Sequence, residues 1–189
     1  GYHDVRYAHD LGDLNPIAYI LRMRLVPLRN LGACISPDNA WIFLQGLETL
    51  ALRMERHSEN ALTLAKELSA DPRVDWVKYP GLMEDPAYPN AKRYFRKGMG
   101  GMVVFGIKGN AAAGERFINA LNLFSHVANV GDARSLAIHP ASTTHSQLDE
   151  KQQKEAGVNP ELVRLSVGIE HIDDILSDID QALTASQKV

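Results

Sequence analysis

The chain has 189 residues, 45% of them hydrophobic, and a formal net charge of −3 at pH 7. This length and apolar content suit one globular domain of ordinary size, or a domain with an arm. Lys and Arg are spread along the chain, which argues against nucleic-acid binding, and no apolar run approaches the roughly 20 residues that span a bilayer. The single cysteine, Cys34, excludes an internal disulfide and fits a reducing compartment such as the cytoplasm.

Residues 1–35 are expected to form an arm followed by a first helix. The arm, residues 1–12, has no period, and its ring-bearing side chains either line a site or pack on a neighbouring chain: Tyr2, His3, Tyr7 and His9. A helix with Pro16 in its first turn is expected next, ended by Pro27 and Gly32. The sequence has neither a secretory leader pattern nor an initiator methionine, which favours a fragment or a processed product.

One long helix is predicted over residues 36–72. Ser36 is its expected N-cap and Pro37 its first helical residue, and an apolar face at helical spacing continues as far as Leu68. If unbroken, about 34 residues at about 1.5 Å each extend about 50 Å, which is longer than one compact domain needs. Gly46 inside the helix costs about 1 kcal/mol relative to alanine, which is compatible with close packing or a bend there. Such a helix often ties two bodies together, so this segment is interpreted as a linking helix before a C-terminal α+β domain, residues 73–189.

Short strands and helices alternate in this C-terminal domain. The apolar runs predict strands over residues 74–79, 101–107, 126–130, 135–138 and 162–167. Helices are expected within residues 85–95, over 111–121, after a cap at Ser146, and after residue 170, where three acidic residues crowd the first turn: Glu170, Asp173 and Asp174. This order predicts an α+β fold in which helices cover one face of a small sheet.

The last predicted strand carries a charged residue at its centre. Leu162, Arg164 and Ser166 share one face of this strand because side chains alternate between the two faces. A guanidinium held in mid-strand is a rigid fork that suits a carboxylate or a phosphate. The pattern alone favours the other interpretation, an arginine on the solvated face of a half-buried sheet.

Other motifs give little support for chemistry. His139 and His145 have no further ligand close in sequence, so a zinc site is not predicted. The glycines within residues 98–101 precede a strand, whereas a phosphate-binding loop follows one. A Ser-His-Asp site stays open, although the chain has no Gly-x-Ser-x-Gly elbow, and Cys34 has no base nearby in sequence.

Three long segments resemble one known family. They read SPDNAWIFLQGLETLALRMERHSENAL, HVANVGDARSLAIHPASTTHS and GVNPELVRLSVGIEHIDDI. They resemble the C-terminal part of the Cys/Met-metabolism pyridoxal-phosphate enzymes, a group that includes O-acetylhomoserine sulfhydrylase, cystathionine γ-synthase, cystathionine γ-lyase and methionine γ-lyase. The segments NVGDARSLAIHPASTTH and LETLALRMERH are most similar to the O-acetylhomoserine sulfhydrylases. The resemblance extends from about Tyr2 to Leu183.

The resemblance implies a fold and a substrate-binding site. In the family, the C-terminal domain of this fold-type I enzyme is a small antiparallel sheet covered by helices and joined by a long helix to a cofactor domain. The arginine of the family's LVRLSVG motif binds the substrate α-carboxylate, and it corresponds to Arg164, which reverses the preference stated above. Asn129 stands where the family often has a serine that helps to hold the carboxylate, and Thr144 is a weaker candidate for the same pocket.

The chain departs from the family in lacking the cofactor-binding residues. The family's cofactor lysine lies in a Ser-x-Thr-Lys motif, but none of the eight lysines here follows a threonine. The lysine and phosphate site for pyridoxal 5'-phosphate are therefore expected outside this chain, in a missing N-terminal cofactor domain. We expect these residues to be the C-terminal portion of a larger enzyme, without a catalytic residue or metal of their own and inactive alone.

For the intact enzyme, the resemblance implies a cytoplasmic, homotetrameric transferase of methionine biosynthesis. It would replace the acetate of O-acetylhomoserine by sulfide or a thiol, giving homocysteine or methionine. Alternatives are cystathionine γ-synthase or a methionine or cystathionine γ-lyase on the same scaffold. A further alternative is a catalytically inert domain used for assembly or amino-acid binding.

Overall fold

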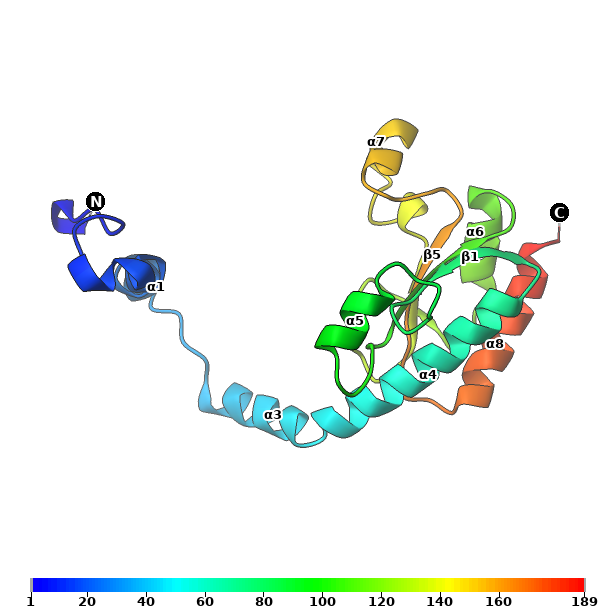
Figure 1. Cartoon of the computed structure of the whole chain (residues 1–189), viewed down its shortest axis with the longest axis horizontal. Coiled ribbons are helices and arrows are strands. Elements are labelled where there is room, and N and C mark those ends of the chain that lie inside the picture. The colour runs from blue at the N-terminus through cyan, green and yellow to red at the C-terminus, as the bar shows by residue number, and fades with distance from the viewer. Residues whose placement is uncertain (1, 189) are drawn as a thin grey trace. The chain divides into compact units, whose positions relative to one another are not determined.

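A computed structural model describes residues 2–188, which form two compact units that divide between Glu48 and Thr49. Figure 1 shows the chain coloured from its N-terminus to its C-terminus. The boundary falls inside residues 36–72, the segment predicted as one linking helix. Within residues 2–188, no helix is long and apolar enough to cross a membrane.

The first unit is helical, with a nearly continuous helical stretch between Gly12 and Leu31. Its elements are η1 (Tyr2–Asp4), η2 (Gly12–Ile17), α1 (Ala18–Met23), η3 (Arg24–Leu28), α2 (Arg29–Leu31) and α3 (Pro37–Glu48). The expectation that Pro27 ends the helix is wrong, because Pro27 lies inside η3, a π-helical turn whose wider ring accommodates a residue without an N–H. Gly32, in the left-handed conformation at φ +66°, ends the stretch.

The single long helix predicted over residues 36–72 is also wrong. The structure has two helices there, α3 and α4 (Leu50–Ala70), separated at Thr49. Thr49 has φ −106° and ψ 4°, and its carbonyl accepts the hydrogen bond from Arg53 N that opens α4. Gly46 and Thr49 both have low helix propensity, and their proximity weakens the helix at this point. The predicted cap of α3 is present, since Ser36 Oγ accepts from Asn39 N at 3.2 Å.

The second unit contains a five-stranded sheet in the order β1-β2-β5-β4-β3. Its strands are β1 (Val74–Lys78), β2 (Met102–Ile107), β3 (Ser125–His126), β4 (Leu136–Ile138) and β5 (Leu162–Ser166). All neighbouring pairs are antiparallel except β3 and β4, which pair in parallel. The strand predicted over residues 126–130 is wrong beyond His126, because the Val127 amide turns back to the Ser125 carbonyl.

Three helices pack on one face of this sheet: α4, α6 (Ala111–Ala120) and α8 (Ile172–Ser186). In Figure 1, α4 and α8 run side by side, and they contact each other. The core between helices and sheet includes Phe105 of β2 and Phe117 of α6, both fully buried, whose rings meet edge to face at 5.5 Å. These contacts confirm the predicted α+β fold with helices on one face.

Smaller elements border the sheet: α5 (Tyr88–Tyr94), η4 (Pro140–Ser142) and α7 (Glu150–Glu155). The expected cap of α7 at Ser146 is wrong. Asp149 is the N-cap, because its carboxylate accepts from Gln152 N at 2.9 Å while the Gln152 side chain accepts from Asp149 N at 3.0 Å. This reciprocal capping box places the helix start three residues later than predicted.

A charged cluster fastens the end of α4 to α8. Arg73 Nη2 lies 2.6 Å from both the Asp71 and the Asp180 carboxylates, and Arg73 Nη1 donates to Thr184 Oγ1 at 2.8 Å. The hydrogen bonds from Arg73 hold the pKa of the Asp71 carboxyl below its usual range, although partial burial opposes the shift. Asp71 therefore stabilises the fold in its charged form.

We predict that Asp71→Asn destabilises the chain at neutral pH and that its difference from the wild type disappears in acid. A lowered folded-state pKa gives stability that is present above the unfolded value of about 3.9 and is lost as the pH falls through the folded value. Urea unfolding from neutral pH to about pH 2 measures this difference. Asp75→Asn, at an exposed position of β1, is the control and is expected to change little. A constant Asp71→Asn difference across the pH range contradicts the assignment.

Candidate functional site

The two faces of β5 carry different sets of residues. Val163, Leu165 and Val167 are fully buried against the helices. The other face of the central strands carries residues that alternate with the core positions: Met102, Val104 and Gly106 of β2, Leu136 and Ile138 of β4, and Leu162, Arg164 and Ser166 of β5. Arg164 is the single charged residue in this set. We call this surface the open face of the sheet.

Arg164 lies at the centre of the open face. It is opposite Val104 of β2 and Ile138 of β4, so a hydrogen-bonded strand flanks its backbone on each side. Its side chain is half-buried. No residue between positions 2 and 188 forms a hydrogen bond or an ion pair with its guanidinium. The backbone of Arg164 is held in place and its guanidinium has no partner within the described residues. Such a guanidinium can bind an external anion through two parallel N–H donors.

Asn129 lies on an exposed loop that is fastened to the same strand. Its side-chain oxygen accepts a hydrogen bond from the Val130 amide at 2.9 Å, which leaves the NH₂ group as a donor. Two residues later, Gly131 N donates to Ser166 Oγ at 3.2 Å, and Gly131 has a positive φ of +79°. Since Ser166 is two residues from Arg164 on the same face, this bond attaches the Asn129 loop to the open face.

Thr144 lies in the turn after η4. Its side chain is exposed, and its hydroxyl lies 2.9 Å from His145 Nδ1. Within residues 2–188, no hydrogen bond joins Thr144 to Arg164 or to Asn129. The structure thus connects two of the three sequence-predicted site residues through Ser166, and it shows no direct link to the third.

Sequence reasoning missed the polar residues behind this site. Ser166 is 3% exposed and Ser135 is fully buried. Glu170 was expected to lie in the first turn of α8, but it precedes the helix, and its carboxylate accepts two hydrogen bonds from Ser135. The partners are 35 residues apart in the chain, and no local pattern predicts such a pair. The single available signal was a polar residue at a strand position whose neighbours are apolar.

The histidines considered for metal binding have other partners. His139 is 1% exposed; its Nε2 lies 2.7 Å from the Pro160 carbonyl and its Nδ1 lies 2.9 Å from Ser142 Oγ. Across the part of the chain that the structure describes, no group of three or more His, Cys, Asp or Glu side chains is placed to hold a metal ion.

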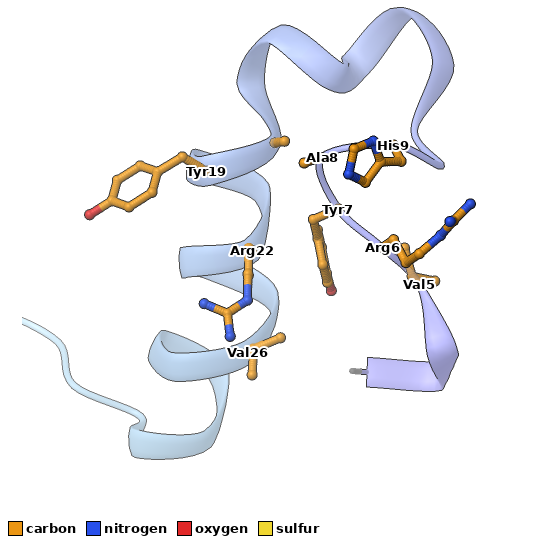
Figure 2. Close-up of a pocket in the computed structure, with 9 residues that line it drawn as sticks. Val5, Arg6, Tyr7, Ala8, His9, Tyr19, Arg22 and Val26 are labelled. Atoms are coloured by element: carbon orange, nitrogen blue, oxygen red, sulfur yellow. The ribbon is translucent and has the colours of Figure 1, made fainter.

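The first unit contains a cavity of about 740 Å³, shown in Figure 2. The Tyr7 ring stands between the loop and the helical turns that carry Arg22 and Val26. Tyr7 and His9, two of the arm residues considered for a site, line this cavity, and its further lining residues are Val5, Arg6, Ala8, Ala18, Tyr19, Arg22 and Val26. Arg6 is paired with Asp10 at 2.8 Å. The arm therefore folds onto the following helix by means of Tyr7, which is 9% exposed.

The open face does not fit a pyridoxal-phosphate site by itself. Covalent attachment of this cofactor needs a lysine amine, but the residues of the open face include no lysine. Its polar groups are a guanidinium, a hydroxyl and a nearby amide, which suit a substrate carboxylate. The residues of this face thus include groups that can bind an anion and no amine that could attach the cofactor.

The sequence profile of the Cys/Met metabolism PLP-dependent enzymes matches residues 13–184. The chain belongs to this family.

Several curated relatives of known activity are similar to the chain over nearly its whole length. The O-acetyl-L-homoserine sulfhydrylase of Leptospira meyeri is 53% identical over 96% of this chain and 42% of the relative. The O-acetyl-L-homoserine sulfhydrylase 1 of Thermus thermophilus is 50% identical over 97% of this chain and 43% of the relative. The chain therefore spans about two fifths of the length of these relatives.

A solved structure agrees with the fold. The crystal structure assigned as an O-acetylhomoserine (thiol)-lyase from Campylobacter jejuni superposes with a TM-score of 0.82 at 43% identity. The match covers 90% of this chain and 41% of that one. The Campylobacter protein carries a pyridoxyl-lysine phosphate residue, and that residue lies beyond the part that corresponds to this chain.

We predict that Ser166→Ala loosens the Asn129 loop. The substitution removes the acceptor for Gly131 N, and a typical hydrogen bond contributes about 1 kcal/mol, so amide exchange at Gly131 should be about fivefold faster. Hydrogen–deuterium exchange followed by NMR measures this rate. Ser69→Ala is the control, because Ser69 Oγ bonds only within α4. An unchanged Gly131 exchange rate means that Ser166 does not hold the loop.

Proposed function

We propose that this chain is the C-terminal part of a pyridoxal-phosphate-dependent O-acetylhomoserine sulfhydrylase and that Arg164 binds the α-carboxylate of its amino-acid substrate. The observation that carries the proposal is the unpartnered, half-buried guanidinium at the centre of the open face. Identities of 50% and 53% to O-acetyl-L-homoserine sulfhydrylases support this activity over others in the family. The reaction replaces acetate by sulfide or a thiol.

Arg164 has a positioning role in this proposal. Its two parallel N–H donors fix the carboxylate plane, and this orients the bond at the substrate α-carbon before reaction. Asn129 donates a further hydrogen bond from its NH₂ group to the same carboxylate, in place of the serine that the family often has. Thr144 contributes at the edge of the pocket. Two or three donors on one carboxylate exclude substrates that lack it.

The remaining features of the intact enzyme are part of the same proposal. The cofactor lysine and phosphate site belong to an N-terminal domain, and residues 73–189 act as the α+β substrate domain behind an arm and a linking segment. The enzyme is a cytoplasmic homotetramer that serves methionine biosynthesis, and the 189-residue chain is inactive alone. These statements rest on the family and on the share of the relatives' length that the chain spans.

Elimination is the second candidate activity. The L-methionine gamma-lyase of Pseudomonas putida is 47% identical over 89% of this chain. Arg164 and its carboxylate serve a lyase equally well, so the open face does not separate the two activities. Assay of the full-length enzyme with O-acetylhomoserine in the presence and absence of sulfide separates them, because a sulfhydrylase needs the acceptor and a lyase does not.

We predict that Arg164→Lys in the full-length enzyme raises KM for O-acetylhomoserine about tenfold or more. A point charge replaces a planar fork, and loss of one charge-assisted hydrogen bond costs about 1.5–3 kcal/mol. Steady-state kinetics with sulfide held constant measures the change. Arg116→Lys is the matched control, because Arg116 bonds the Ser186 carbonyl on the helical side of the sheet. An unchanged KM for the amino-acid substrate contradicts the assignment of Arg164 as the residue that binds the α-carboxylate.

A further inference from the structure

Ser135 joins the three strands that meet behind the carboxylate site. Its carbonyl accepts from Ser125 N of β3 at 2.9 Å, and its own chain continues directly into β4. Its hydroxyl accepts from Gly168 N, just beyond β5, at 2.8 Å. The residue is fully buried, so these bonds are shielded from water.

Glu170 completes this connection. One carboxylate oxygen accepts from Ser135 N at 2.6 Å and the other accepts from Ser135 Oγ at 2.9 Å. Ile169 N donates to the Ala133 carbonyl at 2.9 Å beside this pair. Both bonds from Ser135 end on a charged group, and such bonds are about twice as strong as neutral ones. The segment after β5 is thereby fixed against the start of β4.

Helix α4 holds the same segment from the helical side. Asn60 Nδ2 donates to the Gly168 carbonyl at 3.0 Å and to the Glu170 carbonyl at 2.9 Å. His57 Nδ1 lies 2.6 Å from the Val167 carbonyl and donates to it, because a carbonyl can only accept. Gly168 has no room for a side chain, since a Cβ there would lie 2.5 Å from both Ala133 O and Ser135 N. These hydrogen bonds and close contacts restrict the backbone of residues 167–170 to one conformation.

We propose that Glu170 and Ser135 are positioning residues for substrate binding. They set the position of Arg164 relative to the loop that carries Asn129. This inference rests on the proposed function of Arg164 and Asn129 as carboxylate ligands. Neither Glu170 nor Ser135 touches the substrate in this arrangement. They act through the backbone on both groups that do.

Short stretches of backbone connect Ser135 and Gly168 to Arg164 and Asn129, so a change at the Ser135–Glu170 pair can displace both groups. The strand that leaves Ser135 places Ile138 beside Arg164, and the strand that ends before Gly168 carries Arg164 itself. The loop before Ser135 carries Asn129 and returns to Ser166 through Gly131. A shift between the two strand ends therefore moves the guanidinium and the amide relative to each other. Carboxylate binding at two points tolerates a displacement of only about 0.5 Å.

The test uses Glu170→Gln in the full-length holoenzyme. The amide oxygen can still accept from Ser135 N, but the NH₂ group can only donate to Ser135 Oγ, so the hydroxyl bond must reverse and both bonds lose the charge that strengthened them. We expect KM for O-acetylhomoserine to rise about tenfold while KM for sulfide and kcat change less than about twofold. Glu161→Gln is the matched control at the opposite end of β5, where the carboxylate bonds Trp76 Nε1 at 3.2 Å. It should leave both KM values unchanged.

A double variant separates positioning from a general structural effect. If Glu170 acts through Arg164, adding Glu170→Gln to Arg164→Lys should raise KM for O-acetylhomoserine by less than about twofold, because the two changes affect one interaction. Ser135→Ala carries the same test if Glu170→Gln does not fold, since it removes the hydroxyl that bonds both Glu170 and Gly168.

Three outcomes overturn the inference. A full tenfold effect of Glu170→Gln in the Arg164→Lys background shows that it acts independently of Arg164. A fall in kcat with no change in either KM shows a loss of folded enzyme and no positioning role. An unchanged KM in Arg164→Lys alone overturns the proposed function, and the inference with it, which distinguishes that failure from a failure of the Glu170 assignment.

Discussion

The structure of the second unit depends on the antiparallel pairing of β5 with two neighbours at once. Because side chains alternate along a strand, this position commits one set of residues to the core and the next set to the open face. Val163 and Leu165 are fully buried against the helices. The side chain of Arg164, which lies between them, must therefore point to the opposite face. A shift of the strand register by one residue would turn its charge into the core. The hydrophobic core therefore fixes the direction of the guanidinium.

The alternation along β5 sets the face to which Arg164 points, but it does not set the exact position of the guanidinium. The pairing of β5 with β2 and β4 sets Arg164 to within a strand repeat, but two antiparallel strands can still shear and twist against each other. The Ser135–Glu170 pair and the bonds from α4 constrain this freedom at the strand ends. A half-buried carboxylate that accepts two hydrogen bonds costs less than one left unpaired, so the network is most stable when it is complete.

Elements whose signal is local could be predicted from the sequence. The alternation in residues 162–167 gave β5 and the face of Arg164, and the Ser36-Pro37 pair gave the start of α3. Features that depend on competition between neighbours could not be predicted. Thr49 splits a helix that its apolar face predicts to be continuous, and Pro27 lies in a π turn instead of ending the helix.

Polar pairs between residues far apart in the chain could not be predicted from the sequence for a different reason. Ser135 has apolar neighbours in β4, and Glu170 has acidic neighbours at the start of α8, so each looked like part of its local pattern. Only the fold brings them together. The same holds for Ser166, whose role in holding Gly131 depends on a loop 35 residues away. The resemblance to the family suggested Arg164 and Asn129 as site residues, and the structure shows the strand pairing and hydrogen bonds around each of them.

The strength of the proposed carboxylate binding depends on how well the Arg164 guanidinium is shielded from water. An ion pair that is open to water contributes about 0–1 kcal/mol, because solvent screens the charges and the side chains lose freedom. A hydrogen-bonded pair that is shielded from water contributes about 1.5–3 kcal/mol for each bond. The second unit leaves Arg164 half-buried, between these limits. If Arg164 binds a carboxylate as proposed, any further shielding of its guanidinium from water would strengthen the interaction towards the upper limit.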